Sequence, residues 1–136
     1  MPKPSVAEFV DAFFTRTLFQ DDDVVASSVL ASELSPDAVI NMNGNDLTTE
    51  SFINLINTQF RPAFSAKVLE IRDLNIVTTN TEGTTGVVAQ YTRYETSGKS
   101  DNTILKQSAT TIVAVEERDG KRSITRIWEA QTVDTD

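Results

Sequence analysis

The sequence of 136 residues contains no cysteine and no histidine. The absence of cysteine excludes a disulfide framework, a thiol nucleophile and a thiolate metal site. The absence of histidine removes the commonest general base and the commonest zinc ligand. The chain therefore cannot build a catalytic or metal site that depends on a thiol or an imidazole.

Positive charge is also scarce, because 12 lysines and arginines face 20 acidic residues and leave a net charge of −8. Binding to nucleic acid needs a basic face, so this balance argues against a nucleic-acid partner. No stretch approaches the roughly 20 apolar residues that cross a bilayer. No apolar run typical of a secretory signal follows the first residues. We therefore expect a cytoplasmic protein without a nucleic-acid or membrane partner.

The composition, with 39% hydrophobic and 24% charged residues, is that of an ordinary folded chain. The length suffices for a hydrophobic core without metal or disulfide support. We expect one domain over residues 1–136.

The first half of the sequence has the spacing of amphipathic helices. Ser5 and Glu8 fit a capping box, and apolar residues at helical spacing follow as far as residue 19. The acidic run at residues 21–23 has two interpretations: a cation site, or the start of a second helix, where negative charge meets the positive end of the dipole. We favour the helix start, because consecutive side chains point in different directions.

A short hairpin and a third helix complete this half. Residues 38–42 predict a strand, and Asn43-Gly44 predicts a two-residue turn. Thr48 or Thr49 then caps a helix that Pro62 is expected to end.

The second half predicts four long strands with short connections, which makes neighbouring strands antiparallel. Their predicted ranges are residues 66–79, 85–96, 103–117 and 123–133. The apolar face of such a sheet must be buried, and the three helices are available to cover it. The predicted fold is therefore α+β: a cone-shaped, curved antiparallel sheet wrapped around three helices, with a cavity for a small molecule at its open end.

Particular segments resemble the nuclear-transport-factor-2-like (cystatin-like) superfamily, and within it the SnoaL-like small proteins. The segments are residues 19–23, residues 34–41 and Asp119-Gly120-Lys121 leading into Ile127-Trp128-Glu129. This resemblance covers nearly the whole chain and implies the cone fold. It implies no single activity, because such proteins include isomerases, dehydratases, cyclases and transport adaptors.

The catalytic residues that the resemblance implies are missing. Ketosteroid isomerases use an Asp base on the first strand with a Tyr and a protonated Asp as donors, a worked example of pKa tuning. Here residues 39–43 contain no carboxylate, Phe13 and Phe14 stand where the Tyr would be, and residues 110–113 are uncharged. Resemblance to scytalone dehydratase would imply histidines in the site, and resemblance to the SnoaL-type cyclases would imply an acidic base with a histidine usually nearby; the sequence has no histidine. We therefore reject these specific mechanisms.

Glu129 is the one catalytic candidate, as a general acid or base. It follows a tryptophan, and a carboxylate beside aromatic surface has its pKa raised. The alternative is a solvated carboxylate, or one paired with Arg93 or Lys106 on a neighbouring strand. Alternation along the last strand places Gln131 on the same face as Glu129 and Trp128 on the opposite face. The period does not tell which face lines the cavity.

Five further residues are ligand-binding candidates, and all but Asn41 have a stated structural alternative. Tyr91 and Arg93 suit a carbonyl or anionic group, or form a surface pair. Asn41 and Gln107 suit a carbonyl, and the alternative for Gln107 is a solvated side chain. Trp128 suits either a cavity wall or a subunit interface.

The strand at residues 103–117 carries few charges, and such a face is expected to be covered by a second copy. We therefore expect a homodimer through the sheet, a small hydrophobic or carbonyl-bearing ligand, no cofactor and no metal. Three functions stay open: a cofactor-independent isomerase, dehydratase or cyclase; a non-catalytic ligand-binding or accessory protein; and a protein-interaction module. The sequence does not decide whether the protein is an enzyme.

Overall fold

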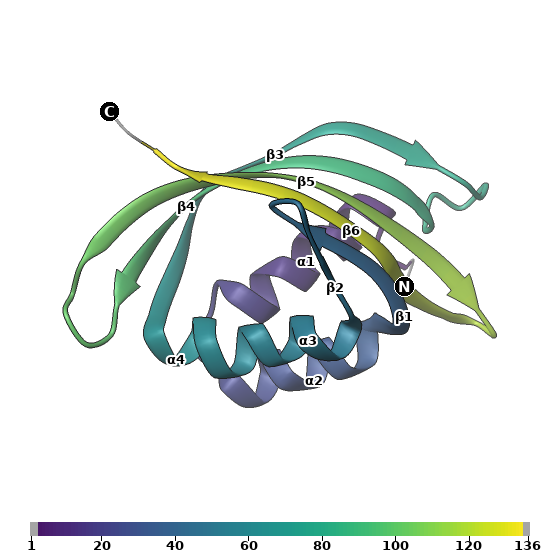
Figure 1. Ribbon diagram of the computed structural model, residues 1–136. Helices are drawn as coiled ribbons and strands as arrows, with labels where there is room; N and C mark the ends of the chain where they lie inside the picture. Colours follow the sequence, from purple (N-terminus) through teal and green to yellow (C-terminus); the bar gives the residue numbers. More distant parts are fainter. Residues whose placement is uncertain (1–2, 135–136) are drawn as a thin grey trace.

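The computed structural model describes residues 3–134 and shows a curved sheet arching over a layer of helices (Figure 1). The helical elements are α1 (Val6–Leu18), α2 (Asp23–Glu33), α3 (Thr49–Asn54), the π-helix η1 (Leu55–Phe60) and α4 (Arg61–Ala63). The strands are β1 (Leu34–Met42), β2 (Asn45–Leu47), β3 (Phe64–Thr78), β4 (Gly86–Gly98), β5 (Ile104–Arg118) and β6 (Lys121–Val133). None of the helices between residues 3 and 134 is long and apolar enough to cross a membrane.

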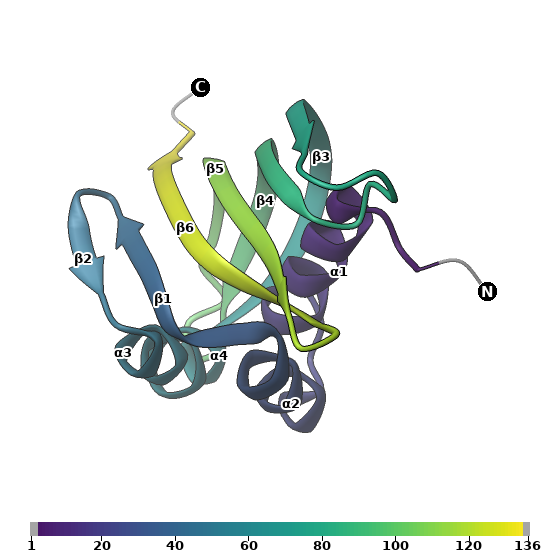
Figure 2. The ribbon, with the colours of Figure 1, turned by 90° about the vertical axis from the view of Figure 1, so that its right-hand side faces the viewer.

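The six strands form one sheet in the order β2-β1-β6-β5-β4-β3. The predicted meander of four long antiparallel strands is confirmed as β3 to β6. The expectation of a purely antiparallel sheet is wrong, because β1 pairs with β6 in parallel and makes the sheet mixed. All the helices lie on the concave side of the sheet (Figure 2). The α+β cone fold is therefore confirmed.

Local capping signals explain where the first two helices begin. The hydroxyl of Ser5 accepts from the amide of Glu8, and the carboxylate of Glu8 accepts from the amide of Ser5. Asp22 caps α2 by accepting from the amides of residues 24 and 25. Asp23 pairs with Arg61 over 2.8 Å. The acidic run is a helix start, as favoured, and no cluster of three metal-binding side chains occurs within residues 3–134.

The predicted turn at Asn43-Gly44 is confirmed, with φ of 55° and 90° at the two residues. The prediction that Pro62 ends the third helix is wrong, because helical structure runs through it to Ala63. α4 continues directly from η1, and Pro62 is the next-to-last residue before the helical structure ends at Ala63. The preceding segment, Leu55–Phe60, is a π-helix, in which hydrogen bonds join residues five apart instead of four. Such insertions occur frequently at functional sites.

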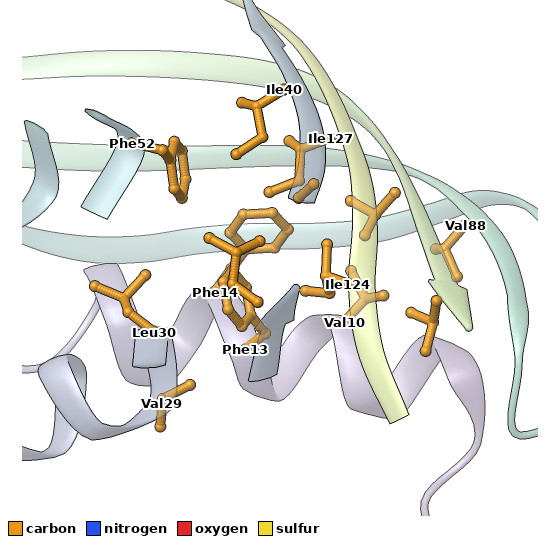
Figure 3. Packing of buried hydrophobic residues seen from close by; sticks show 14 of the residues in the cluster. Val10, Phe13, Phe14, Val29, Leu30, Ile40, Phe52, Val88, Ile124 and Ile127 are labelled. Carbon is orange, nitrogen blue, oxygen red and sulfur yellow. The ribbon is translucent and has the colours of Figure 1, made fainter. Parts of the chain in front are cut away.

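The hydrophobic core lies between α1, α2 and the concave face of the sheet (Figure 3). Val10 and Phe13 of α1 are fully buried against Val88 of β4 and against Ile124 and Ile127 of β6. These residues come from one helix face and from alternate strand positions, as the two periodicities require. Phe14, Phe52 and Ile56 belong to this core and also line a cavity beside it.

Candidate functional site

A cavity of about 340 Å³ lies between the concave face of the sheet and the helices, next to the packed core. Its size falls in the range of small-molecule sites. Most of its wall is apolar, and the polar lining residues come from the sheet, apart from Gln59 of η1. The lining residues are Phe14, Leu18, Phe19, Met42, Phe52, Leu55, Ile56, Gln59, Phe60, Phe64, Thr92, Tyr94, Ala109, Thr111, Glu129 and Gln131.

Most of the polar wall of the cavity arises because the side chains on the concave face of the sheet change from apolar to polar along the strands. On β6, the buried Ile124 and Ile127 are followed on the same face by Glu129 and Gln131. On β5 the order along the chain is reversed: Thr111 comes before the fully buried Val113 on the same face. Since β5 and β6 run antiparallel, these changes meet in space, and Glu129 is the direct register partner of Thr111.

Glu129 is half-buried on the cavity wall. The hydroxyl of Thr111 donates a hydrogen bond of 3.2 Å to its Oε1. Burial raises the pKa of Glu129, and the hydrogen bond from Thr111 opposes that rise only in part. The alternative pairing with Arg93 is wrong, because Arg93 pairs with Asp134 on the other face of the sheet. Among the described residues, no cation pairs with Glu129.

Tyr94 lies beside this carboxyl in a network of side-chain hydrogen bonds. Its hydroxyl donates to Oε1 of Gln107 and accepts from Nε2 of Gln131, both over 3.1 Å. Nε2 of Gln107 donates in turn to the hydroxyl of Thr96 over 3.0 Å. Burial, together with the negative charge of Glu129, raises the pKa of Tyr94 to about 12, so its hydroxyl stays protonated.

The turn between β1 and β2 fixes the part of β6 that carries these side chains. The backbone N–H of Asn43 donates to the carbonyl of Glu129, and the backbone N–H of Gln131 donates to Oδ1 of Asn43, both over 2.8 Å. Two bonds from one turn residue therefore hold the backbone on both sides of the carboxyl. The positions of both cavity side chains on β6 depend on this turn.

The opposite wall is aromatic and comes from the helices and the start of β3. The Phe19 ring lies 5.6 Å from the Tyr94 ring, and the Phe60 ring lies 5.8 Å from the Phe64 ring, measured between centroids. Phe60 belongs to η1, so the π-helix contributes directly to the cavity. A ligand in this cavity would therefore contact aromatic side chains as well as the Glu129 carboxyl.

Three of the sequence-derived candidates lie on the convex face of the sheet, so the prediction that they bind a ligand in the cavity is wrong. Tyr91 stacks under the guanidinium of Arg72 at 5.3 Å. Arg93 pairs with Asp134 over 3.5 Å. Trp128 is 59% exposed. Alternation places these residues opposite Thr92, Tyr94 and the β6 cavity residues, and the cavity lies on the other side.

Asn41 and Gln107 also lie outside the cavity wall. The side chain of Asn41 donates to Asp46 over 2.9 Å and accepts from the amide of Gly44 over 3.0 Å, so it stabilises the hairpin. Gln107 lies behind Tyr94 and holds its hydroxyl. Gln107 therefore acts on the cavity only by positioning the hydroxyl of Tyr94.

Thr92, Tyr94 and Thr111 line the cavity as well, and the sequence did not single them out. Their signal is the same alternation: Thr92 and Tyr94 share a strand face with the fully buried Val88, and that face had to be the concave one. The missing information was the register that sets Thr111 opposite Glu129. A shift of one residue would have reversed every assignment.

No protein-family model matches the sequence, and no curated protein matches it. Solved structures do match in fold. A ketosteroid isomerase-like protein from Erwinia carotovora has a TM-score of 0.71 at 11% identity, over 93% of this chain and 92% of its own. A hexachlorocyclohexane dehydrochlorinase from Novosphingobium barchaimii has a TM-score of 0.61 at 15% identity, over 93% and 82%.

Nuclear transport factor 2 from Cryptosporidium parvum matches with a TM-score of 0.55 at 10% identity, over 93% of this chain and 91% of its own. Together with a SnoaL-like structure, this match confirms that the chain has the nuclear-transport-factor-2-like fold. At such identities the similarity concerns the fold alone. Function has to be argued from the cavity.

Proposed function

We propose that this protein binds an apolar small molecule in the cavity and that Glu129 moves a proton to or from it without a cofactor, as an isomerase, dehydratase or cyclase does. One observation carries this proposal. Glu129 is the only charged residue among the described lining residues, and the rest of the wall is mostly apolar. A lone carboxyl in such surroundings is a candidate for acid–base work.

The surroundings of Glu129 suit a proton transfer. Burial raises its pKa toward neutral pH, and a higher pKa makes the ionised carboxylate a stronger base. Thr111 orients one carboxyl oxygen and leaves the other free for a ligand. The names of two similar structures, one isomerase-like and one a dehydrochlorinase, are consistent with small-molecule chemistry in this fold.

Incorporation of solvent deuterium tests the proposal without a known substrate. The protein is incubated in deuterium oxide with a panel of small apolar carbonyl and imine compounds, and carbon-bound hydrogens are followed by NMR. We expect exchange at one compound or more with the wild type, and its loss in Glu129→Gln. Glu116→Gln is the matched control, because Glu116 is exposed on β5 and lies outside the cavity. Equal exchange in Glu129→Gln and the wild type would refute the proposal.

The absence of a second acid or base on the described cavity wall favours one alternative, a non-catalytic ligand-binding protein. Tyr94 does not fill that second role, since its raised pKa keeps its proton in place. This alternative predicts saturable binding of a panel compound with no deuterium incorporation in any variant.

We further propose that the protein is a homodimer joined through the convex sheet face. On this face Trp128 is 59% exposed and its register partner Ile112 is 46% exposed. Val39 of β1 is 54% exposed and lies on the same face, because its register partner Arg126 shares that face of β6 with Trp128. Large apolar side chains exposed on one sheet face are expected to be covered by a partner. A location in the cytoplasm stays a prediction, which cell fractionation tests.

A further inference from the structure

The polar end of the cavity offers acceptors to a ligand and few donors. The Tyr94 hydroxyl donates to Gln107, and the Gln131 amide donates to that tyrosine oxygen and, over 3.4 Å, to Gln107. The Thr111 hydroxyl donates to Oε1 of Glu129. Oε2 of Glu129 and Oε1 of Gln131 have no hydrogen-bond partner within residues 3–134. A ligand at this end therefore meets a carboxyl oxygen and an amide oxygen.

Few donors remain elsewhere on the wall. Thr92 carries a hydroxyl, which both donates and accepts. Gln59 carries an amide, but it lies exposed on η1, on the helical side of the cavity. A carbonyl or carboxylate at the Glu129 end would consequently leave the acceptors there unpaired, which is costly in an apolar cavity.

The charge distribution points the same way. The arginine closest to the cavity along the chain is Arg61, which follows Phe60, and its guanidinium is already used: it donates to Asp23 over 2.8 Å and to the carbonyl of Thr17 over 2.9 Å. The cavity thus holds one carboxyl and, among its described lining residues, no cation. An anionic ligand would be repelled, whereas a cationic ligand would supply the missing partner of Glu129.

The aromatic wall suits a cation as well. The phenylalanines of α1, α3, η1 and β3 present apolar ring surface to the cavity, and these residues are Phe14, Phe19, Phe52, Phe60 and Phe64. Aromatic ring faces attract ammonium groups through the ring quadrupole, and the attraction is stronger where water is excluded. Aromatic walls and one carboxyl are a combination that binds an apolar cation.

We propose that the cavity takes an organic ammonium ion, with its apolar body against the phenylalanines and its protonated nitrogen on the free oxygens of Glu129 and Gln131. This inference rests on the proposed function, because it names the ligand class of the same cavity. It departs from the carbonyl-bearing ligand that the sequence suggested. The N–H groups of the ligand pair with the acceptors that the protein leaves free.

Calorimetric titration with four shape-matched probes tests this assignment: naphthylmethylamine, naphthylmethanol, naphthaldehyde and naphthoate. We expect the ammonium probe to bind at least about tenfold more tightly than the alcohol. This difference corresponds to the free energy of one charge-assisted hydrogen bond. Glu129→Gln should remove that advantage, and Glu116→Gln should keep it. Tighter binding of the alcohol, the aldehyde or the carboxylate would overturn the assignment.

The pH dependence of the wild type gives a second measurement that needs no variant. An ammonium ion binds the ionised form of Glu129, so its affinity should rise with pH as the carboxyl loses its proton. A carbonyl held by the protonated carboxyl would show the opposite trend, and that trend would overturn the assignment. Tight binding of a neutral probe would leave the proposed function standing, whereas the failure of all four probes to bind would refute both.

Discussion

The hydroxyl of Thr111 donates a hydrogen bond of 3.2 Å to Oε1 of Glu129, directly across the β5–β6 pair. The next register partner of Thr111 is Gln90 of β4, and Gln90 pairs in turn with Asp73 of β3. One polar row thus crosses four strands on the concave face. Its β6 end lies in the cavity, and Gln90 of β4 donates both to Asp73 of β3 and to Asp11 of α1.

Replacement of Thr111 by valine removes the donor but keeps the shape of the side chain. The hydrogen bond lowers the pKa of Glu129, so we expect that pKa to rise further in Thr111→Val. The free energy of unfolding should fall by about 1 kcal/mol, as for the loss of one hydrogen bond. Carboxyl-carbon NMR and urea unfolding measure the two effects. Thr110→Val, at an exposed position next along β5, is the control and should change neither.

The pH dependence of stability should distinguish wild type from Glu129→Gln. The folded-state pKa of Glu129 lies above its ordinary value of 4.5. As pH rises through the window between those values, the unfolded state releases its proton first, so the free energy of unfolding of the wild type falls. Glutamine does not ionise. The free energy of unfolding of Glu129→Gln, relative to that of the wild type, should therefore rise as pH increases from 4.5 and level off above the folded-state pKa. Urea unfolding at several pH values measures this difference, and a difference that does not vary with pH would contradict the prediction.

A second pair of carboxylates predicts an effect on Asp11. Nε2 of the buried Gln90 donates to both Asp11 and Asp73, which brings the two acids together. Burial, and then the negative charge of Asp73, raises the pKa of Asp11. Asp73→Asn removes that charge, so the pKa of Asp11 should fall toward its ordinary value. Carboxyl-carbon NMR measures it, and Glu70→Gln on the same strand, which no such hydrogen bond joins to Asp11, should leave it unchanged.

A lysine at Trp128 tests the proposed dimer. Trp128→Lys introduces a charge into the exposed apolar part of the convex face, so we expect a dimer in the wild type and a monomer in this variant. Sedimentation velocity at several concentrations measures both states. Val24→Lys, on the exposed surface of α2, is the matched control and should remain dimeric. A wild type that sediments as a monomer at every concentration would refute the proposal.

The fold followed closely from local signals. The capping box at Ser5 and the turn at Asn43-Gly44 lie where the sequence predicted them, because both depend on a few neighbouring residues. The parallel pairing of β1 with β6 joins segments about 85 residues apart, and no local pattern specifies it. The π-helix was likewise missed, because its sequence has the spacing of an ordinary helix.

The candidate site was predictable only in part. The sequence singled out Glu129 by its chemistry, and the structure places it on the cavity wall. Tyr91 and Arg93 drew attention for the same kind of reason, but alternation puts them on the convex face. The sequence showed which residues share a face, whereas only the packing of α1 against Val88 shows which face is concave.

Titration of the Glu129 carboxyl carbon by NMR, with and without a cavity ligand, tests the central claim most directly. The ligand is whichever of the naphthyl probes binds best, and Glu129→Gln assigns the resonance. We predict that Glu129 titrates above 4.5 in the free protein and that its pKa shifts when the ligand binds. Titration at the ordinary value, with no change when the ligand binds, would contradict the account.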